Sequence, residues 1–284
     1  MKKVNSDHFD GKTKKLVHSQ TALAALLICV FFTSVVTVFG NLILDMSPPV
    51  RLTVFTIGQL MLSGTVILLM RKLEVFDISD FSFKGIGKGL LLAWFGIVYI
   101  TVSFFIACMQ IPENSFIAPN VFYLFIVVLH PFIGTALYEE ALYRGLVLKL
   151  LLKKYGHSKR GIINACIISS AFFGFFHICN MLTAPVLPTI TQIISAAAVG
   201  LFCAVIFVRT RKLLIPMLFH GLLNLSTQIF NAIVSPDAMM QNAGAETGTD
   251  VIGFIIMTLL STLPILIAGL VLLRKVKPDG LSNE

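Results

Sequence analysis

Long apolar segments recur along the 284-residue chain and are separated by short polar connections. Each is close to the roughly 20 residues that an α-helix needs to cross the hydrocarbon core of a bilayer. Because backbone polar groups in lipid must be paired within the segment, such runs predict helices. We therefore predict an all-α, polytopic membrane protein with about eight transmembrane helices, at residues 20–44, 52–70, 86–109, 116–138, 161–182, 189–208, 213–233 and 251–273. The fourth helical pattern continues past Glu139 to about Tyr155, so this helix is predicted to be long or bent.

Basic residues gather in every second connection. They occur in both tails and after the second, fourth and sixth segments, whereas the other connections carry almost none, with Arg51 as the exception. By the positive-inside rule, both termini are predicted to be cytoplasmic. The predicted organisation is an N-terminal tail (1–19), one membrane domain (20–273) and a C-terminal tail (274–284). The cytoplasmic segment 75–83 either lies along the membrane interface or forms a short solvated loop.

Composition supports the membrane assignment and narrows the partners. Hydrophobic residues make up 56% of the chain and charged residues 13%, about half the charged share of a soluble domain. The net charge of +8 is spread in short groups between apolar runs rather than on one basic face, so no nucleic-acid partner is expected. The five cysteines lie within or beside apolar segments and are interpreted as small core residues rather than a disulfide framework.

A cluster of ionisable residues continues the fourth segment as Glu139-Glu140-Ala141-Leu142-Tyr143-Arg144. Charges at membrane depth cost at least about 2.5–3.5 kcal/mol on insertion scales, so they are kept where they are paired or functional. Glu140 and Arg144 are four residues apart and share a helix face, so they can form an ion pair. Glu139 points about 100° away and lacks that partner. The pattern indicates either a structural ion pair at a helix end or one neutralised and one reactive glutamate.

Two histidines lie in later apolar segments. His177 closes the sequence Phe173-Gly174-Phe175-Phe176-His177, where Gly174 would allow a close approach of two helices. His220 and Asn224 are four residues apart and face the same way, so both can donate a hydrogen bond to one point. Each histidine could instead be a hydrogen-bonded core residue or make a contact between helices. His130, in the fourth segment, faces roughly away from Glu139 and is interpreted as structural.

Depth along the helices decides whether these groups can meet. At 1.5 Å per residue, His220 lies roughly 12 Å beyond Lys212, Glu139 roughly 15 Å before Lys149, and His177 roughly 25 Å beyond Arg160. The groups can therefore converge in a cavity reached from the cytoplasmic side, provided that the fifth helix begins outside the hydrocarbon.

Such a set of groups suits amide hydrolysis. A carboxylate in a poorly solvated site can take a proton from water, and a histidine beside it can hold that water. Two side-chain donors can stabilise the oxyanion of a tetrahedral intermediate. No activated serine or cysteine is evident, so water is the expected nucleophile.

In their order along the chain, these motifs resemble the CPBP family, which comprises type II CAAX prenyl endopeptidases and bacterial Abi or bacteriocin-immunity proteins. The matching motifs are EExxxR, FxxxH and HxxxN, formed by Glu139-Glu140…Arg144, Phe173…His177 and His220…Asn224. The resemblance covers about residues 120–230, which it marks as the catalytic core.

The resemblance implies an intramembrane endopeptidase that hydrolyses a peptide bond of a membrane-associated protein or peptide. It implies that Glu139 is the general base, that His177 helps to activate water, and that His220 and Asn224 form the oxyanion hole. The implied supporting residues are Glu140, Arg144 and Phe173. The expected location is a bacterial cell membrane; nothing in the chain identifies a prenyl pocket, and no oligomeric state is predicted.

Three alternatives stay open at this point. Family members have been described both as glutamate-dependent proteases and as metalloproteases, and Glu139, His177 and His220 could bind zinc with an open fourth position. A metal-free site is preferred, because there is no HExxH sequence and Asn224 is a poor zinc ligand. A non-catalytic bacteriocin-immunity or peptide-binding protein could use the same residues. A transporter is disfavoured, because no inverted repeat is evident.

Overall fold

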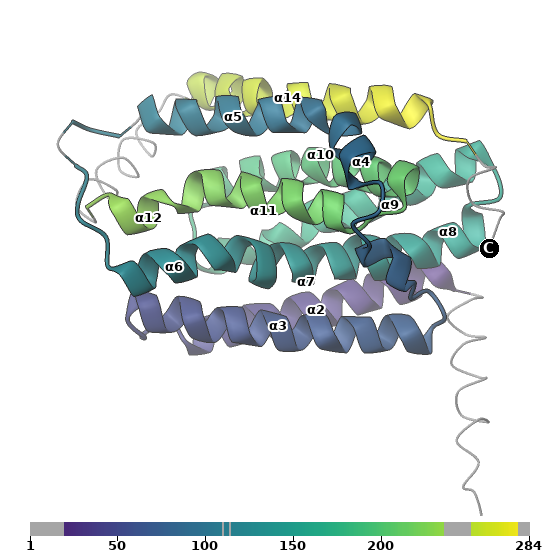
Figure 1. Ribbon diagram of the computed structural model, residues 1–284, viewed down its shortest axis with the longest axis horizontal. Helices are drawn as coiled ribbons and strands as arrows, with labels where there is room; N and C mark the ends of the chain where they lie inside the picture. Colours follow the sequence, from purple (N-terminus) through teal and green to yellow (C-terminus); the bar gives the residue numbers. More distant parts are fainter. Residues whose placement is uncertain (1–19, 110, 114, 236–250, 278–284) are drawn as a thin grey trace, which may run out of the picture.

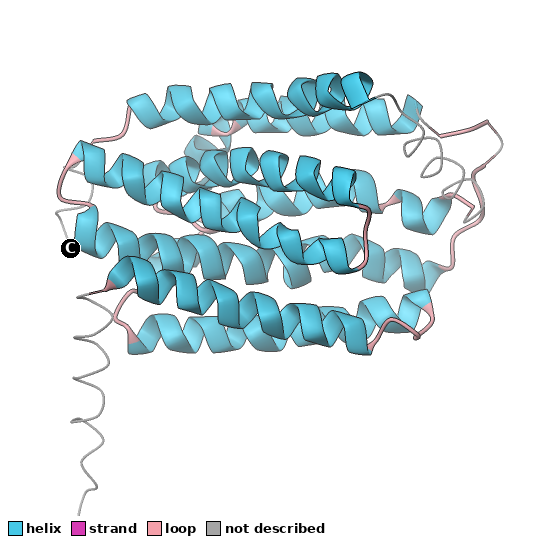
Figure 2. Cartoon of the chain, turned by 180° about the vertical axis from the view of Figure 1, so that it is seen from behind, coloured by secondary structure: helices cyan, strands magenta, loops and turns pink. Residues whose placement is uncertain are grey.

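The computed structural model describes residues 20–109, 111–113, 115–235 and 251–277, without the side chains of residues 251–254 and 257. These residues form helices that run along one long axis (Figure 1), and the connections lie chiefly at the two ends of the bundle (Figure 2). In the described residues, extended backbone pairs only in an isolated bridge between Phe116 and Val234. The predicted tails, residues 1–19 and most of 274–284, lie outside the described residues. The fold is that of an all-α, polytopic membrane protein.

Helices occur in each of the eight ranges predicted to span the membrane. Those before the long central helix are α2 (Thr21–Leu42), α3 (Pro48–Lys72), the 3₁₀-helix η1 (Ile78–Phe81), α4 (Ile86–Leu92) and α5 (Trp94–Met109). The central helix comprises α6 (Val121–Leu129), η2 (His130–Ala136), α7 (Leu137–Glu140), η3 (Ala141–Leu148) and α8 (Lys149–Tyr155). The rest are α9 (Lys159–Phe175), η4 (Phe176–Leu182), α10 (Val186–Thr210), α11 (Leu214–Gln228), α12 (Phe230–Ile233) and α14 (Val251–Arg274).

Not every predicted span is a single long apolar helix. Five helices of the described chain are long and apolar enough to cross a membrane, and the pair α4–α5, bent by 63°, would make a sixth. The seventh range is divided between α11 and α12, and the eighth qualifies only as the shorter segment Thr258–Arg274 within the described residues.

The fourth predicted helix is long, as the sequence indicated, and runs without a break for 35 residues, Val121–Tyr155. Two parts of it, η2 and η3, are π-helical and flank the short α-helical segment α7 that carries the two glutamates. Pro131 is the second residue of η2 and has no N–H to donate to the preceding turn, which weakens the regular α-helical bonding there. π-Helical turns inserted into α-helices often occur at functional sites.

Helix α10 is the central helix of one half of the bundle. Its residues 198–208 form an unbroken buried run, and it packs between α9 and α14. The turns that follow Lys72, Tyr155 and Thr210 lie at one end of the bundle, which we call the basic end because these connections carry lysine and arginine. The opposite end, which we call the far end, holds the connections at 43–47 and 183–185 (Figure 1).

A polar latch holds η1 against the basic end. The buried Asp80 carboxylate pairs with Lys149, and its backbone carbonyl accepts from the N–H of Leu213 at 2.8 Å. Lys212 Nζ donates to the carbonyl of Ser79 at 2.8 Å. Burial raises the pKa of the Asp80 carboxyl above its ordinary value, and the Lys149 ammonium opposes that shift by favouring the carboxylate. Segment 75–83 is therefore a tethered strap rather than a free solvated loop.

Helices α9 and α10 make a close approach at Gly174. A Cβ atom added there would lie 2.6 Å from the carbonyl oxygen of Ile193 and 2.7 Å from Cβ of Ala197. The glycine therefore sets the spacing of two helices that surround the polar cluster, as its position in the sequence suggested.

We expect Gly174→Ala to lower the free energy of unfolding by about 1–3 kcal/mol, because the added methyl group collides with backbone that cannot move independently. The matched control is Gly64→Ala on α3, where an added Cβ meets nothing within 4 Å. That change should be neutral or stabilising by up to about 1 kcal/mol, because alanine favours helix. Unfolding in detergent, followed by intrinsic fluorescence, measures both; equal effects would contradict the close approach.

Asp80→Asn should cost about 3 kcal/mol of unfolding free energy, because it leaves the largely buried Lys149 ammonium without its counter-charge. Glu74→Gln is the control, since Glu74 lies 3.8 Å from Lys153 and both side chains are about half exposed or more. An exposed pair contributes about 0–1 kcal/mol. The same unfolding assay compares the two, and a larger loss in Glu74→Gln would refute the latch.

Candidate functional site

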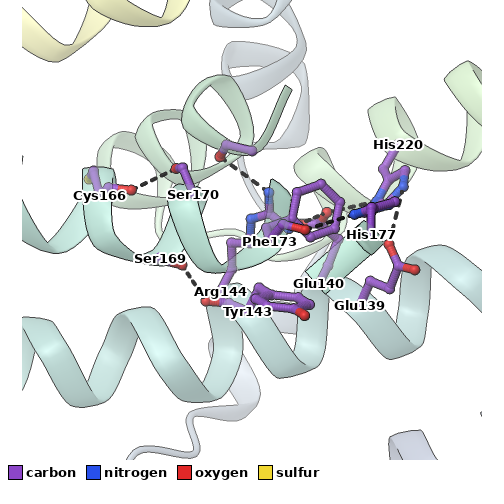
Figure 3. Close-up of polar contacts among 11 residues, drawn as sticks. Glu139, Glu140, Tyr143, Arg144, Cys166, Ser169, Ser170, Phe173, His177 and His220 are labelled. Atoms are coloured by element: carbon purple, nitrogen blue, oxygen red, sulfur yellow. Dashed lines mark hydrogen bonds and ion pairs between the residues drawn. The ribbon is translucent and has the colours of Figure 1, made fainter. Parts of the chain in front are cut away.

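The site residues predicted from the sequence come together around one cavity. Glu139 projects from α7, His177 from η4, and His220 and Asn224 from α11. All four line a cavity of about 320 Å³ inside the bundle. The structure therefore brings together residues from three helices that are separated along the chain, and Figure 3 shows Glu139, His177 and His220 among them.

Glu140 and Arg144 form the buried ion pair that their spacing predicted. Arg144 Nη1 donates to Glu140 Oε1 at 2.9 Å, and the two side chains are 1% and 0% exposed. Arg144 Nη2 also donates to the carbonyl of Gly200 on α10 at 3.2 Å. His220 Nδ1 lies 2.8 Å from the same Glu140 oxygen. One carboxylate thus links the central helix to α11, and its arginine partner links it to α10.

Phe173 lies at the centre of these contacts. The Arg144 guanidinium lies 4.4 Å from the centre of its ring, a cation–π geometry. The rings of His177 and His220 approach the same phenyl ring edge to face, with centroids 5.1 and 5.6 Å away (Figure 3). The phenyl ring lies between the buried ion pair and His177, and it contacts both the Arg144 guanidinium and the His177 imidazole.

The second motif has a direct structural explanation. His177 Nδ1 lies 2.8 Å from the backbone carbonyl oxygen of Phe173. A carbonyl can only accept, so Nδ1 carries the proton, and a neutral ring then leaves Nε2 as an acceptor. The FxxxH motif places His177 four residues after Phe173, which is the spacing that this hydrogen bond from side chain to backbone requires. The half-buried imidazole lines the cavity and can accept a hydrogen bond from water.

Glu139 is the carboxylate left outside the arginine pair. Its side chain is 20% exposed, and its Oε2 lies 3.6 Å from His220 Nε2. His220 therefore lies between the two glutamates, with Nδ1 against Glu140 and Nε2 toward Glu139. Asn224 lies one turn further along α11 and lines the same cavity. Glu139 is thus the acidic group that the cavity presents to a bound molecule.

Glu139 and His177 lie at nearly the same depth in the bundle when depth is measured from the turn that joins α8 to α9. Glu139 precedes the end of α8 at Tyr155 by roughly 24 Å of helix, and His177 follows the start of α9 at Lys159 by roughly 27 Å. The two helices form an antiparallel hairpin, so residues equally far from the turn are neighbours. Ser169 Oγ, which donates to the carbonyl of Tyr143 at 2.9 Å, fixes that register.

The prediction that His130 faces away from Glu139 is wrong, because His130 lines the same cavity. Nine residues of regular α-helix would place the two side chains about 180° apart. The π-helical turn η2 lies between them and inserts an extra residue per turn, which rotates one side chain toward the other. His130 Nδ1 lies 2.9 Å from Thr56 Oγ1, and its Nε2 lies 3.1 Å from Thr135 Oγ1.

Helix α3 contributes a polar wall that the motifs did not indicate. Gln59 lines the cavity and accepts from Thr135 Oγ1 at 3.4 Å, while Thr56 holds His130. Thr56, Gln59 and Ser63 are spaced three and four residues apart and are all buried. This spacing places them on one helix face. The signal was therefore present in the sequence, as a polar stripe on an otherwise apolar helix.

A second cavity of about 450 Å³ adjoins the first. The two share seven lining residues: Val36, Thr37, Phe55, His130, Cys179, Asn180 and Gln228. The second cavity, which we call the vestibule, also reaches Leu44, Thr183 and Asn231, which lie at the far end of the bundle.

The direction of access therefore differs from the expected cytoplasmic entry. Toward the basic end the space is filled, because η3 and residues 198–208 of α10 are buried throughout. The helix continues past Lys149 to Tyr155, so Glu139 lies deeper than the roughly 15 Å expected from the sequence. Glu139 lies near the middle of that helix, and the hollow half of the bundle is the half at the far end.

The zinc alternative was Glu139, His177 and His220. Among the described residues, no group of three or more histidine, cysteine, aspartate or glutamate side chains has a geometry that could hold a metal ion. These three side chains line one cavity without converging on one point, so they do not fit a zinc site.

Together, the fold and the cluster define a polytopic α-helical membrane protein with a glutamate–histidine site inside its bundle. Residues 121–226 match the family model described as type II CAAX prenyl endopeptidase Rce1-like. The matched segment, 106 of the 284 residues, contains all three motifs, so the resemblance to the CPBP family is confirmed there. The chain matches no curated protein and no solved structure.

We expect Cys179, which lines both cavities, to react with a small membrane-impermeant thiosulfonate applied at the far end of the bundle. The test uses a variant in which the other four cysteines are replaced by alanine, in sealed vesicles of each orientation. A matched variant keeps only Cys203, which is fully buried and should stay unlabelled from either side. Faster labelling of Cys179 from the basic end would contradict access through the vestibule.

Proposed function

We propose that the protein is an intramembrane endopeptidase that hydrolyses a peptide bond of a membrane-associated protein or peptide with water activated by Glu139 and His177. One observation carries the proposal: Glu139, His177, His220 and Asn224 line a single cavity in an apolar bundle, and Glu139 is outside the arginine pair. The match of this segment to a protease family supports the same conclusion.

The buried charges are balanced in a way that leaves Glu139 available. Glu140 and Arg144 neutralise each other, and the pair is held by Gly200, Phe173 and His220. Removing either partner would leave the other charge buried and unpaired, which is costly at this depth, so we assign Glu140 and Arg144 to bracing the site rather than to the reaction. Within the described residues, Glu139 has no such neutralising arginine, and it keeps part of its surface open to the cavity.

The hydrolytic step follows from these positions. A water molecule in the cavity donates one hydrogen bond to Glu139 and one to His177 Nε2. Its oxygen attacks the carbonyl carbon of the substrate while Glu139 takes a proton. The carbon–nitrogen bond of the tetrahedral intermediate then breaks, and Glu139 returns the proton to the leaving amine. The products are one carboxyl and one amine terminus, with Glu139 restored.

His220 and Asn224 are suited to the developing oxyanion. The Asn224 amide provides N–H donors at the cavity wall. His220 already presents Nδ1 to Glu140, and a doubly protonated ring donates from Nε2 as well. One such oxyanion donor contributes about 2.7–4 kcal/mol to transition-state stabilisation.

The neighbouring glutamates provide a matched test. Glu139→Gln should reduce kcat by about 10²–10⁴-fold, the usual contribution of a general base, with little loss of stability. Glu140→Gln should instead lower the free energy of unfolding by about 3–5 kcal/mol, because it leaves Arg144 buried without its counter-charge. Peptidomics of cells that carry wild type or Glu139→Gln identifies the accumulating precursor, whose cleavage by purified protein in lipid nanodiscs is then measured.

Retained cleavage in Glu139→Gln would overturn the mechanism. A cellular phenotype that survives in Glu139→Gln would favour a binding or immunity role for the same residues. We propose that no metal takes part, so dialysis against a chelator should leave the rate unchanged. Loss of activity on chelation, restored by added zinc, would contradict that part of the proposal.

A further inference from the structure

Gln59 carries a buried amide to which the proposed hydrolysis assigns no role. The side chain lies on α3, is 3% exposed, and lines the cavity around Glu139, which we call the catalytic cavity. Its Oε1 accepts from Thr135 Oγ1 at 3.4 Å, and within the described residues no other hydrogen bond of this side chain is found. The two N–H groups of its Nε2 therefore remain available to a molecule in the cavity.

The amide of Gln59 is held in place against the central helix. Thr135, which binds its oxygen, belongs to the π-helical turn η2. Gly134 lies beside it, and a Cβ atom added to this glycine would lie 2.9 Å from Gln59 Oε1. The glycine therefore lets the amide lie directly on the helix backbone. A donor that is fixed before its ligand arrives loses less conformational entropy on binding, so Gln59 is suited to recognition.

The chemistry of the amide defines the group that it can bind. Buried donors are nearly always paired with protein or water, because an unpaired one is costly. A peptide that displaces water from the cavity must therefore supply an acceptor to Gln59. The amide has no charge to attract an ion, and every residue of a peptide presents a neutral acceptor in its main-chain carbonyl.

The position of Gln59 relative to Glu139 determines which carbonyl it meets. Thr135, which binds the amide, precedes Glu139 by four residues, roughly 6 Å along the central helix. An extended peptide advances about 3.3 Å per residue, so two residues cover that distance. Helices α3 and α11 both pack against η2. A peptide in the cavity thus meets Gln59 from one helix and the proposed oxyanion donors His220 and Asn224 from the other.

We propose that Gln59 is a substrate-binding residue whose amide donates a hydrogen bond to the main-chain carbonyl of the residue about two positions from the scissile bond. The contact recognises the peptide backbone, so it holds substrates of different sequence in one register. This inference rests on the proposed endopeptidase function and adds a main-chain binding site to it.

The test begins with a defined mixture of synthetic 14-residue peptides incubated with the full-length protein in lipid nanodiscs, and mass spectrometry locates each cleaved bond. The peptide cleaved fastest is then resynthesised with one peptide bond at a time replaced by a trans alkene, which removes both the carbonyl and the N–H. A parallel series carries N-methyl groups at the same bonds, which removes the N–H and keeps the carbonyl. The values of kcat and KM are measured for every version.

The proteins compared are wild type, Gln59→Met, Ser63→Ala and Glu139→Gln. Methionine is about as long as glutamine and lacks the N–H donors. Ser63 is the matched control, because it is buried on the same face of α3 but lines neither cavity. Its hydroxyl donates to the main-chain carbonyl of Gln59 at 2.8 Å, a bond within the helix.

In wild type, the alkene about two residues from the cut should lower kcat/KM about three- to tenfold, as expected for one neutral hydrogen bond. N-methylation at the same bond should have a smaller effect. Gln59→Met should lower kcat/KM of the unmodified peptide by a similar factor, chiefly by raising KM, because the contact lies away from the reacting bond. That variant should be indifferent to this alkene, whereas Ser63→Ala should respond to it as wild type does.

Two failures are distinguishable. Cleavage that depends on Glu139, with no alkene-sensitive bond at this distance or with equal sensitivity in Gln59→Met, would overturn the role of Gln59 alone. No cleavage by wild type, or equal cleavage by Glu139→Gln, would overturn the proposed function and this inference with it. If Gln59→Met fails to fold, as judged by its thermal unfolding, Gln59→Asn decides. Its shorter side chain withdraws the amide, so full retention of the alkene effect there contradicts the contact.

Discussion

The buried pair of Glu140 and Arg144 is the constraint on which the rest of the site depends. An unpaired charge at this depth would cost several kcal/mol, so both side chains must be neutralised and hydrogen-bonded wherever the bundle closes around them. Their partners lie on different helices: Gly200 on α10, Phe173 on α9 and His220 on α11. The contacts of one ion pair therefore connect four helices, and the groups proposed to be catalytic lie on those helices or, for His177, directly after α9.

The bundle divides at this pair into a filled half and a hollow half. On the basic side, η3 and residues 198–208 of α10 are buried without interruption. On the far side, polar residues of α3, η4 and α11 line the two adjoining cavities. Hydrolysis needs water beside a carboxylate but apolar surroundings that strengthen its interactions. The buried residues of the filled half provide apolar surroundings for the proposed reaction, and the cavities of the hollow half provide space for water.

Most of this arrangement could be predicted from local spacing, and the rest depends on how helices pack. The Glu140–Arg144 pair follows from a spacing of four residues, and the long central helix follows from an apolar pattern that continues to Tyr155. The orientation of His130 could not be predicted with α-helical periodicity, because the π-helical turn η2 changes the phase of the helix. The direction of access depended on which half of the bundle is filled, and single helices do not reveal that.

The order of the three motifs in the sequence has a geometric meaning. Two helices joined by a tight turn place residues at equal distances from the turn side by side, and Glu139 and His177 lie at nearly equal distances from the turn after α8. The next hairpin, α10–α11, has its turn at the same basic end: Gly200 precedes Thr210 by roughly 15 Å of helix, and His220 follows Leu214 by roughly 9 Å. Both contact the central ion pair although they lie at unequal distances from their turn, so the equal spacing holds for the first hairpin and not for the second. In the α8–α9 hairpin, the spacing of Glu139 and His177 along the chain is set by their distance from the turn, and an insertion in that turn would be tolerated more readily than one between the turn and either residue.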